Sequence, residues 1–262
     1  MPDAQTIIVV PCYNEAERMS VDSFREFAAK HPEVRFLFVN DGSTDDTSIV
    51  LESLAATEPQ RFEHLDQGRN QGKAEAVRKG MLHALAQPAR YVGYWDADLA
   101  TPLAEIPRFV DVLESHPERD ICFGSRVRLL GRAIERNPLR HYLGRMFATV
   151  ASHVLALPVY DTQCGAKLFR ATRNSTHLFE QPFSVNWTFD VEIIARLQAL
   201  AISRRGRTAA DSIYELPLNE WRDVAGSKVQ AADFFAAFFE MLRIWSKYGR
   251  GGAKGMPEGE TP

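Results

Sequence analysis

The sequence predicts a three-layer α/β/α protein with a mostly parallel central sheet. Short apolar runs rich in β-branched and aromatic residues alternate with stretches of helical periodicity through the first half of the chain. Strands and helices in this rhythm build parallel sheets that are covered by helices on both faces. With 262 residues, of which 45% are hydrophobic, the chain can bury a sizeable core as one large domain.

Composition narrows the classes of function and location. The net charge of −3 gives no support to nucleic-acid binding. The three cysteines, Cys12, Cys122 and Cys164, are odd in number and widely spaced, which favours a reducing compartment over a disulfide framework. The apolar runs are too short to span a bilayer, and the N-terminal residues lack the features of a signal peptide. We therefore expect a cytoplasmic protein without a transmembrane helix, a signal peptide or a nucleic-acid partner.

In the first half, each expected strand runs into a polar or glycine-containing loop. The expected elements are strand 6–10, helix 21–30, strand 34–39, a helix after 47, strand 61–65, a helix from 73 to 86, strand 91–95 and a helix that ends near 116. After the second strand, Gly42 permits a tight turn, and Thr44 or Asp45 can cap the next helix. This loop is explained equally well as a capped turn or as a place where Asp41 accepts hydrogen bonds from a nucleotide base.

The second half is less regular and ends in an amphipathic helix. We expect strand 120–124, a helix from 138 to about 157, strand 168–170, a helix that ends near 200, strand 213–216 and a helix over 231–248. On the last helix one face collects apolar residues, namely Phe234, Phe238, Met241, Leu242 and Trp245. Two interpretations stay open for this face: core packing, or peripheral contact with an anionic membrane surface. The tail 249–262 is rich in Gly, Pro and charge, and we expect it to be disordered.

Two carboxylates follow the fourth expected strand. Asp96 and Asp98 stand two residues apart, so on a regular strand they would point to the same face. Their mutual repulsion is relieved by a divalent cation, and carboxylate oxygens suit Mg²⁺ or Mn²⁺. Such ions commonly share their ligands with substrate phosphates. The pair therefore indicates a metal–diphosphate site, although an ordinary Asp-rich turn would give the same letters.

Two further stretches suit anions. Residues 68–73 form a glycine-rich loop that ends in Gly72-Lys73 at a helix start, where backbone N–H groups attract phosphate. It is not a P-loop, because the GxxxxGK[ST] pattern is absent. Between 126 and 145 there are six arginines against one acid, Glu135. This segment is either a solvated surface or an anion site, since Arg binds phosphate oxygens in a bidentate manner.

These motifs occur together in an order that resembles family 2 glycosyltransferases, and in particular the branch that glucosylates dolichyl or polyprenyl phosphate. The motifs are PCYNEAER at 11–18, NDGSTDDT at 40–47, RNQGKAEAVRKG at 69–80, DADLATP at 96–102, GSR at 124–126, DTQCGAKLF at 161–169, WTFDVE at 187–192 and GSK at 226–228. The resemblance implies a GT-A fold, a nucleotide-sugar donor, Mg²⁺ or Mn²⁺ as the cofactor and inversion at the anomeric carbon. It also implies one domain over 1–248, with a donor half to about 125 and an acceptor half from about 126.

The resemblance also assigns roles to residues. The implied donor-binding residues are Pro11, Tyr13, Glu15, Asp41, Gly72, Lys73 and Asp96, with Asp96 and Asp98 holding the metal. The implied acceptor-phosphate residues are Arg126, Arg140, Arg145, Lys167 and Lys228. The implied catalytic residues are Asp98, Arg126, Gln163 and Asp190. The chain departs from the family pattern at Asn40, where many relatives have Asp, and at Ala166, where the branch often has Phe; eukaryotic members also carry a membrane span.

The function that this resemblance implies is transfer of a hexose, with glucose from UDP-glucose as the expectation, to a polyprenyl or dolichyl phosphate at the cytoplasmic membrane face. A phosphate acceptor is already anionic, so it needs positioning by Arg more than deprotonation. Asp190 is the candidate base if the acceptor is a hydroxyl. The alternatives are a GDP-mannose-dependent polyprenyl-phosphate mannosyltransferase, a hydroxyl-directed glycosyltransferase and a non-catalytic nucleotide-sugar-binding module.

Overall fold

A computed structural model describes residues 5–135, 138–204, 207–223 and 231–249. Its centre is one sheet in the order β3-β2-β1-β4-β7-β5-β8. The strands are β1 (Thr6–Cys12), β2 (Val34–Asn40), β3 (Phe62–Asp66), β4 (Tyr91–Trp95), β5 (Ile121–Ser125), β7 (Ala166–Arg170) and β8 (Ile213–Pro217). Of these, β7 alone runs antiparallel to its neighbours, β4 and β5. The mostly parallel sheet that the sequence predicted is confirmed.

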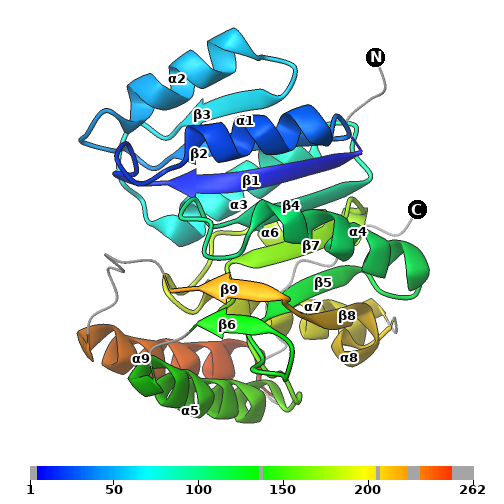
Figure 1. The fold of residues 1–262 in the computed structure, drawn as a ribbon. Helices are drawn as coiled ribbons and strands as arrows, with labels where there is room; N and C mark the ends of the chain where they lie inside the picture. Colours follow the sequence, from blue (N-terminus) through cyan, green and yellow to red (C-terminus); the bar gives the residue numbers. More distant parts are fainter. Residues whose placement is uncertain (1–4, 136–137, 205–206, 224–230, 250–262) are drawn as a thin grey trace.

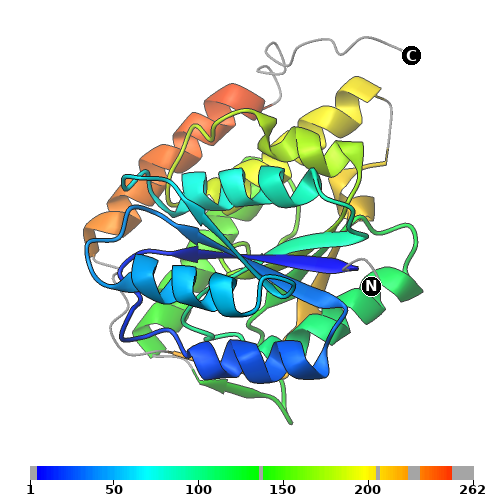
Figure 2. The same ribbon diagram turned by 90° about the horizontal axis from the view of Figure 1, so that it is seen from above.

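Helices cover both faces of this sheet (Figure 2). They are α1 (Val21–Lys30), α2 (Thr47–Thr57), α3 (Lys73–Leu85), α4 (Ile106–Ser115), α5 (Pro138–Leu155), α6 (Arg173–Glu180), α7 (Phe189–Arg204), α8 (Ala209–Ser212) and α9 (Ala231–Tyr248). A 3₁₀ turn, η1 (Leu103–Glu105), precedes α4. The helices over 21–30 and 231–248 have the predicted bounds, whereas α6 and α8 were not predicted because they are short.

The buried apolar residues form two clusters, one on each face of the sheet. Alternate residues of β1 divide between them: Ile7 and Val9 pack with α3, whereas Ile8 and Val10 pack with Phe24 of α1. Because strand side chains alternate in direction, a strand that is buried on both sides must be apolar throughout. This is why the central strands β1 and β4 appear in the sequence as apolar runs.

A second, two-stranded sheet lies beside the main one (Figure 1). It pairs β6 (Ala133–Glu135) with β9 (Glu220–Arg222) in parallel. Neither strand was predicted, since three residues show no measurable periodicity. The pairing brings the arginine-rich segment next to Trp221, which is buried.

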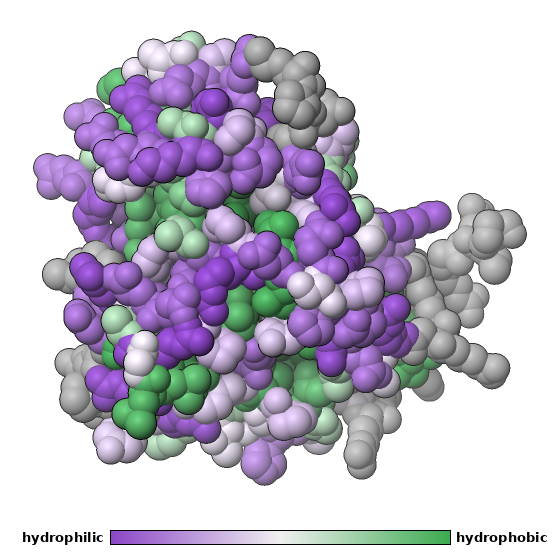
Figure 3. Space-filling model, turned by 45° about the vertical axis from the view of Figure 1, so that its right-hand side comes forward, coloured by the Kyte–Doolittle hydropathy of each residue, from purple (hydrophilic) through white to green (hydrophobic). Residues whose placement is uncertain are grey.

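The helices α5 and α9 lie side by side at one end of the molecule (Figure 1). The core side of α9 consists of Ala237, Met241 and Ile244, which are buried. Both helices also carry exposed apolar side chains, called here the apolar face, namely Tyr142, Met146, Val150, Phe238, Phe239, Leu242 and Trp245. Figure 3 shows a hydrophobic patch at the lower edge of the molecule, at the height of α5 in Figure 1. Most of the predicted stripe is therefore exposed, except Met241; the side chain of Phe234 lies outside the described residues.

No described helix combines the length and apolar character that crossing a membrane requires. The predicted tail falls almost wholly on 250–262, which lies outside the described residues.

Candidate active site

The candidate site lies where β1, β2 and β4 end. From β1 the chain moves outward to β2 and β3 and then crosses back to β4 on the other side of β1, so the strand order reverses at β1. Open α/β sheets bind ligands at such a switch point, outside the carboxyl ends of the strands. Two cavities meet here, and both are lined by Lys73, Asp96 and Asp98. The shared residues therefore stand at the junction of two compartments.

The first cavity, of about 400 Å³, is called here the donor cavity. All the predicted donor and metal residues line it: Pro11, Tyr13, Glu15, Asp41, Gly72, Lys73, Asp96 and Asp98. Arg18 and Asn70 also line it, and neither was among the predicted donor residues. Every one of these residues comes from a strand end, the loop that follows it or the first turn of a helix, so the cavity is built from βα connections.

Asp41 fixes the glycine-rich loop. Its carboxylate accepts the N–H of Gln71 at 2.7 Å and that of Gly72 at 2.8 Å. Burial raises the pKa of Asp41, although these N–H groups oppose the rise. Next to it, Gly42 has φ +63°, and a side chain there would collide with the backbone of Arg69. Asp41 therefore has a structural role in the loop and also lines the cavity.

Lys73 pairs with the first carboxylate of the Asp-x-Asp motif. Its Nζ lies 2.5 Å from Asp96 Oδ1, and the side chains are 48% and 32% exposed. Burial by itself would lower the pKa of Lys73, but the charge and hydrogen bond of Asp96, together with the charges of Asp190 and Asp98, raise it. Gly165 lets this carboxylate approach, because a side chain there would overlap the carboxyl group of Asp96.

Asp98, like Asp96, is half-buried. Burial, and next the charge of Asp96, raise the pKa of Asp98. Among the described residues no group of three or more His, Cys, Asp or Glu side chains could hold a metal by itself. Two like-charged carboxylates in a cavity do fit a hard divalent ion that completes its shell with substrate phosphate oxygens and water.

The second cavity, of about 280 Å³, is called here the acceptor cavity. Four of the predicted acceptor and catalytic residues line it in addition to Asp98: Arg126, Arg145, Gln163 and Asp190. Aromatic side chains complete the wall, namely Phe147, Tyr160, Trp187, Phe189 and Trp221. The structure thus brings together positions that lie far apart in the sequence.

Arg126 is held by a partner that the sequence analysis did not assign. Its Nε and Nη2 donate to Asp161 at 2.7 and 2.8 Å, in a bidentate pair whose side chains are 13% and 9% exposed. Glu215 in turn accepts the backbone N–H groups of Tyr160 and Asp161. Burial would lower the pKa of Arg126, but the charge of Asp161 keeps it raised. Arg126 is therefore fixed in direction at the cavity wall.

Arg145 lies against an aromatic ring. Its guanidinium carbon is 3.9 Å from the ring centroid of Tyr160, within range of a cation–π contact. Both residues line the acceptor cavity. Of the other predicted phosphate contacts, Lys228 and the side chain of Arg140 lie outside the described residues.

Lys167 is fully buried behind the cavity wall instead of lining it. Its Nζ lies 2.6 Å from Asp190 Oδ1 and donates to the carbonyl of Cys164 at 2.6 Å. Tyr94 also donates to Asp190 Oδ1, at 2.5 Å. The structure thus places Lys167 as a partner of Asp190, at a position different from the predicted phosphate contact. Tyr94 was missed because it reads as an ordinary strand residue.

Some polar groups of the acceptor wall are buried without a hydrogen-bond partner. They are Gln163 Nε2 and Thr162 Oγ1. A buried polar group without a partner costs about 1–3 kcal/mol, so a bound ligand that supplies oxygens would recover this energy. Gln163 was predicted; Thr162 was not, although it stands next to it in the same motif.

Solved structures with the same fold can be identified. A glucosyl-3-phosphoglycerate synthase from Mycobacterium tuberculosis, solved with Mn²⁺, UDP and glucosyl-3-phosphoglycerate, has a TM-score of 0.61 at 18% identity, over 94% of this chain and 80% of that one. A mannosyltransferase from Pyrobaculum calidifontis, solved with GDP-Man and Mn²⁺, has a TM-score of 0.62 at 16% identity, over 99% of this chain and 66% of that one. These likenesses show the glycosyltransferase GT-A fold.

Sequence comparison then gives the family. Residues 7–175 match the family described as Glycosyl transferase family 2. A dolichyl-phosphate beta-glucosyltransferase from Trichomonas vaginalis is 32% identical over 92% of this chain and 71% of its own length, and one from Saccharomyces cerevisiae is 28% identical over 86% and 69%. The chain belongs to glycosyl transferase family 2 and is a glycosyltransferase.

Proposed function

We propose that this glycosyltransferase moves glucose from UDP-glucose to a dolichyl or polyprenyl phosphate. The observation that carries the proposal is the junction of the two cavities at Lys73, Asp96 and Asp98. One cavity contains the carboxylates and the glycine-rich loop, and the other contains two arginines. The names of the relatives support the sugar and the lipid, since each is called a dolichyl-phosphate beta-glucosyltransferase. The proposal divides the domain near residue 125 into a donor half and an acceptor half.

On the donor side, Asp96 and Asp98 would hold Mg²⁺ or Mn²⁺ against the diphosphate. When bound, such an ion stabilises the negative charge that gathers on the leaving nucleoside diphosphate. Lys73 is 48% exposed and within 2.5 Å of Asp96, so its ammonium stands at the junction where that charge develops. The solved neighbours, which contain Mn²⁺ with nucleotides, support a divalent ion.

On the acceptor side, a phosphate oxygen would attack the anomeric carbon while the bond from that carbon to the diphosphate oxygen breaks. The leaving diphosphate takes the electron pair, and the configuration at carbon inverts. No proton has to be removed from a phosphate that is already ionised. Arg126 and Arg145 would bind and orient it, because guanidinium groups form charge-assisted hydrogen bonds with phosphate. Asp190, tied to Lys167 and Tyr94, would keep the wall in place.

For the lipid chain, we propose that the apolar face of α5 and α9 contacts a membrane surface. Tyr142 and Met146 are 71% and 66% exposed, and two of the residues between them in the sequence, Gly144 and Arg145, line the acceptor cavity. A phosphate bound in the cavity would therefore leave its polyprenyl chain close to exposed apolar side chains. Burying such side chains at a lipid surface removes apolar area from water.

The test is transfer of radiolabelled sugar into an organic-extractable product. UDP-glucose and GDP-mannose are compared as donors, and a short polyprenyl phosphate and the matching free alcohol as acceptors, each with and without Mg²⁺ or Mn²⁺. We expect product only from UDP-glucose, the phosphate and the metal together. Transfer from GDP-mannose would show that the donor sugar is mannose and not glucose. Equal transfer to the alcohol would indicate a hydroxyl acceptor, with Asp190 as the candidate base. Donor binding without any turnover would indicate a non-catalytic binding module.

A further inference from the structure

The C-terminal helix α9 contacts the acceptor site from outside. Among the described residues, none of those lining the cavity belongs to α9. The turn that precedes α7 does line it, through Asn186 and Trp187, and Asp190 follows in the first turn of the helix. Glu240, near the middle of α9, is hydrogen-bonded to this turn and does not itself line the cavity.

The carboxylate of Glu240 accepts four donors from three consecutive residues. Oε1 accepts the N–H of Asn186 at 2.9 Å, and Oε2 accepts those of Trp187 at 3.1 Å and Thr188 at 2.8 Å. The hydroxyl of Thr188 donates to the same Oε2 at 2.9 Å. This carboxylate also lies at the N-terminus of α7, where the helix dipole stabilises negative charge. One side chain thereby fixes the backbone of the whole turn.

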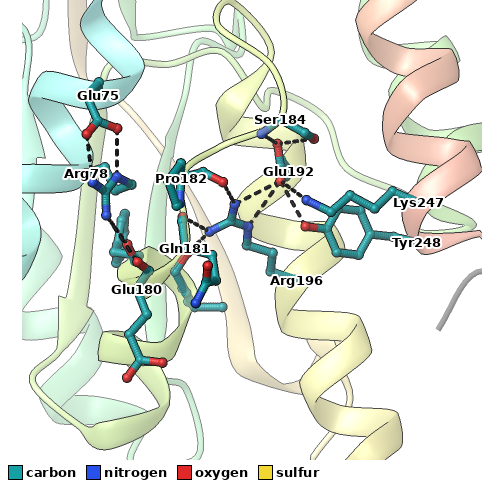
Figure 4. A network of polar contacts seen from close by, with 12 residues as sticks. Glu75, Arg78, Glu180, Gln181, Pro182, Ser184, Glu192, Arg196, Lys247 and Tyr248 are labelled. Carbon is teal, nitrogen blue, oxygen red and sulfur yellow. Dashed lines mark hydrogen bonds and ion pairs between the residues drawn. The ribbon is translucent and has the colours of Figure 1, made fainter. Parts of the chain in front are cut away.

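A second contact holds α9 against α7. Glu192, fully buried in α7, accepts the hydroxyl of Tyr248 at 2.9 Å and pairs with Lys247 at 3.4 Å, as Figure 4 shows. The same carboxylate pairs with Arg196 at 2.9 Å. Burial would raise the pKa of Glu192, but the charge of Arg196 and the hydrogen bonds around it lower the pKa. The helix α9 is thus bonded to α7 near its middle and at its end.

The residues of α9 beside Glu240 face in two directions. Phe239 is 68% exposed and belongs to the apolar face, whereas Met241 is buried in the core. Glu240 therefore connects the helix that carries the apolar face to the turn that forms the cavity wall. No other described side chain accepts the N–H groups of Asn186 and Thr188.

We propose that Glu240 is a positioning residue of the acceptor site, a role that rests on the function proposed above. It holds the turn 186–188 so that Trp187 and Asp190 face the cavity. Its loss should impair acceptor use and leave the donor cavity unchanged, because the donor residues come from the other half of the chain. Charge-assisted hydrogen bonds are worth about 1.5–3 kcal/mol, which corresponds to roughly tenfold to hundredfold in acceptor kcat/KM.

The experiment uses Glu240→Gln, which keeps the volume but replaces one acceptor oxygen with an N–H₂ group that faces donors. The matched control is Glu26→Gln, a change of the same charge at an exposed position of α1. Amide hydrogen exchange is measured in peptides that cover 184–190 and in peptides from the donor half. Steady-state kinetics with a polyprenyl phosphate and the UDP-glucose dissociation constant are measured in parallel.

We expect faster exchange over 184–190 only, a loss of tenfold or more in acceptor kcat/KM, and a donor dissociation constant within twofold of the parent. Unchanged exchange at the turn would overturn the proposal, and so would faster exchange with intact acceptor kinetics. An equal loss of donor binding would show a general structural role instead and would also overturn it. If the parent transfers nothing to polyprenyl phosphate, the proposed function fails, and the exchange data still decide whether Glu240 holds the turn.

Discussion

The two lysine–aspartate pairs of the site differ in their exposure to water. In the donor cavity, Lys73 and Asp96 are 48% and 32% exposed. Behind the acceptor cavity, Lys167 and Asp190 are 0% and 9% exposed. Exposed pairs contribute little to stability and can exchange partners, whereas a buried pair must stay matched. We infer that the donor region can admit a charged ligand, whereas the acceptor region is built around the buried ion pair of Lys167 and Asp190.

The same contrast extends to the backbone. The donor cavity is lined by loops that directly follow β1, β2, β3 and β4, and Asp41 after β2 holds the glycine-rich loop after β3. The acceptor wall draws on α5, the motif 161–165, the turn before α7 and β9, which only tertiary contacts bring together. We infer that substitutions in the two regions will fail in different ways, the first in ligand binding and the second in stability or acceptor use.

The largest expected effect tests this contrast with the two lysines. Lys167→Met leaves the buried carboxylate of Asp190 without its cationic partner, and we expect the free energy of unfolding to fall by about 3–5 kcal/mol. Lys73→Met should change it by less than about 1 kcal/mol, because that pair is exposed. Urea unfolding of both variants gives the comparison. The double variant Lys167→Met/Asp190→Leu should recover part of the loss; equal destabilisation by the two single variants would contradict the distinction.

The next effect concerns turnover in the donor region. Asp98→Asn removes one of the two carboxylates proposed to hold the metal, and we expect kcat to fall roughly 10²–10³-fold with the fold intact. Donor binding should also stop responding to Mg²⁺ or Mn²⁺, as followed by thermal stabilisation in UDP-glucose. Asp111→Asn, an exposed change in α4, is the control. Full activity of the Asp98 variant, or of the parent in excess chelator, would remove the metal from the mechanism.

The comparison also explains what the sequence could predict. Most of the predicted donor residues follow β1, β2 and β4, which are largely apolar runs, so their positions at one sheet edge could be inferred from order alone. The residues that hold the acceptor wall in place could not be inferred in this way. In the sequence, Tyr94 is an ordinary residue of an apolar strand, and Glu215 is a polar residue of an edge strand. Glu240 stands in a run of phenylalanines and alanines that predicts only an amphipathic helix. Such partners become visible when distant segments are packed together.

Arg126 shows the same limit at one residue. Its motif predicted a phosphate ligand, and the structure adds a bidentate partner, Asp161, that the motif alone does not reveal. The two short strands that the sequence did not predict show the same limit: β6 and β9 form a sheet by pairing with each other. Short-range periodicity fixes long helices and buried strands, whereas a buried ion pair depends on the whole fold.

A smaller effect, on acceptor use, is expected when Arg126 and its partner Asp161 are both replaced by neutral residues. Arg126→Gln alone would leave Asp161 unpaired, so the variant to measure is Arg126→Gln/Asp161→Asn, which keeps two polar side chains in contact. We expect acceptor kcat/KM to fall roughly tenfold to hundredfold, because the phosphate loses a charge-assisted bond. The UDP-glucose dissociation constant should stay within about twofold. Asp161→Asn alone is the control, and a parallel loss of donor affinity would place Arg126 outside the acceptor site.

The smallest expected effect is on vesicle binding through the apolar face, which we propose contacts a lipid surface. We expect the protein to sediment with anionic vesicles and to be released as the salt concentration rises, because Arg243 and Lys247 on α9 are exposed cations. Phe239→Ser and Trp245→Ser should each weaken vesicle binding on the order of fivefold, because each removes apolar area that the bilayer would cover. Ile49→Ser, an equally exposed apolar residue on α2 in the donor half, should have no effect. Vesicle binding that is absent at low salt, or that Ile49→Ser weakens as much as Trp245→Ser does, would show that the apolar face is not where lipid is met.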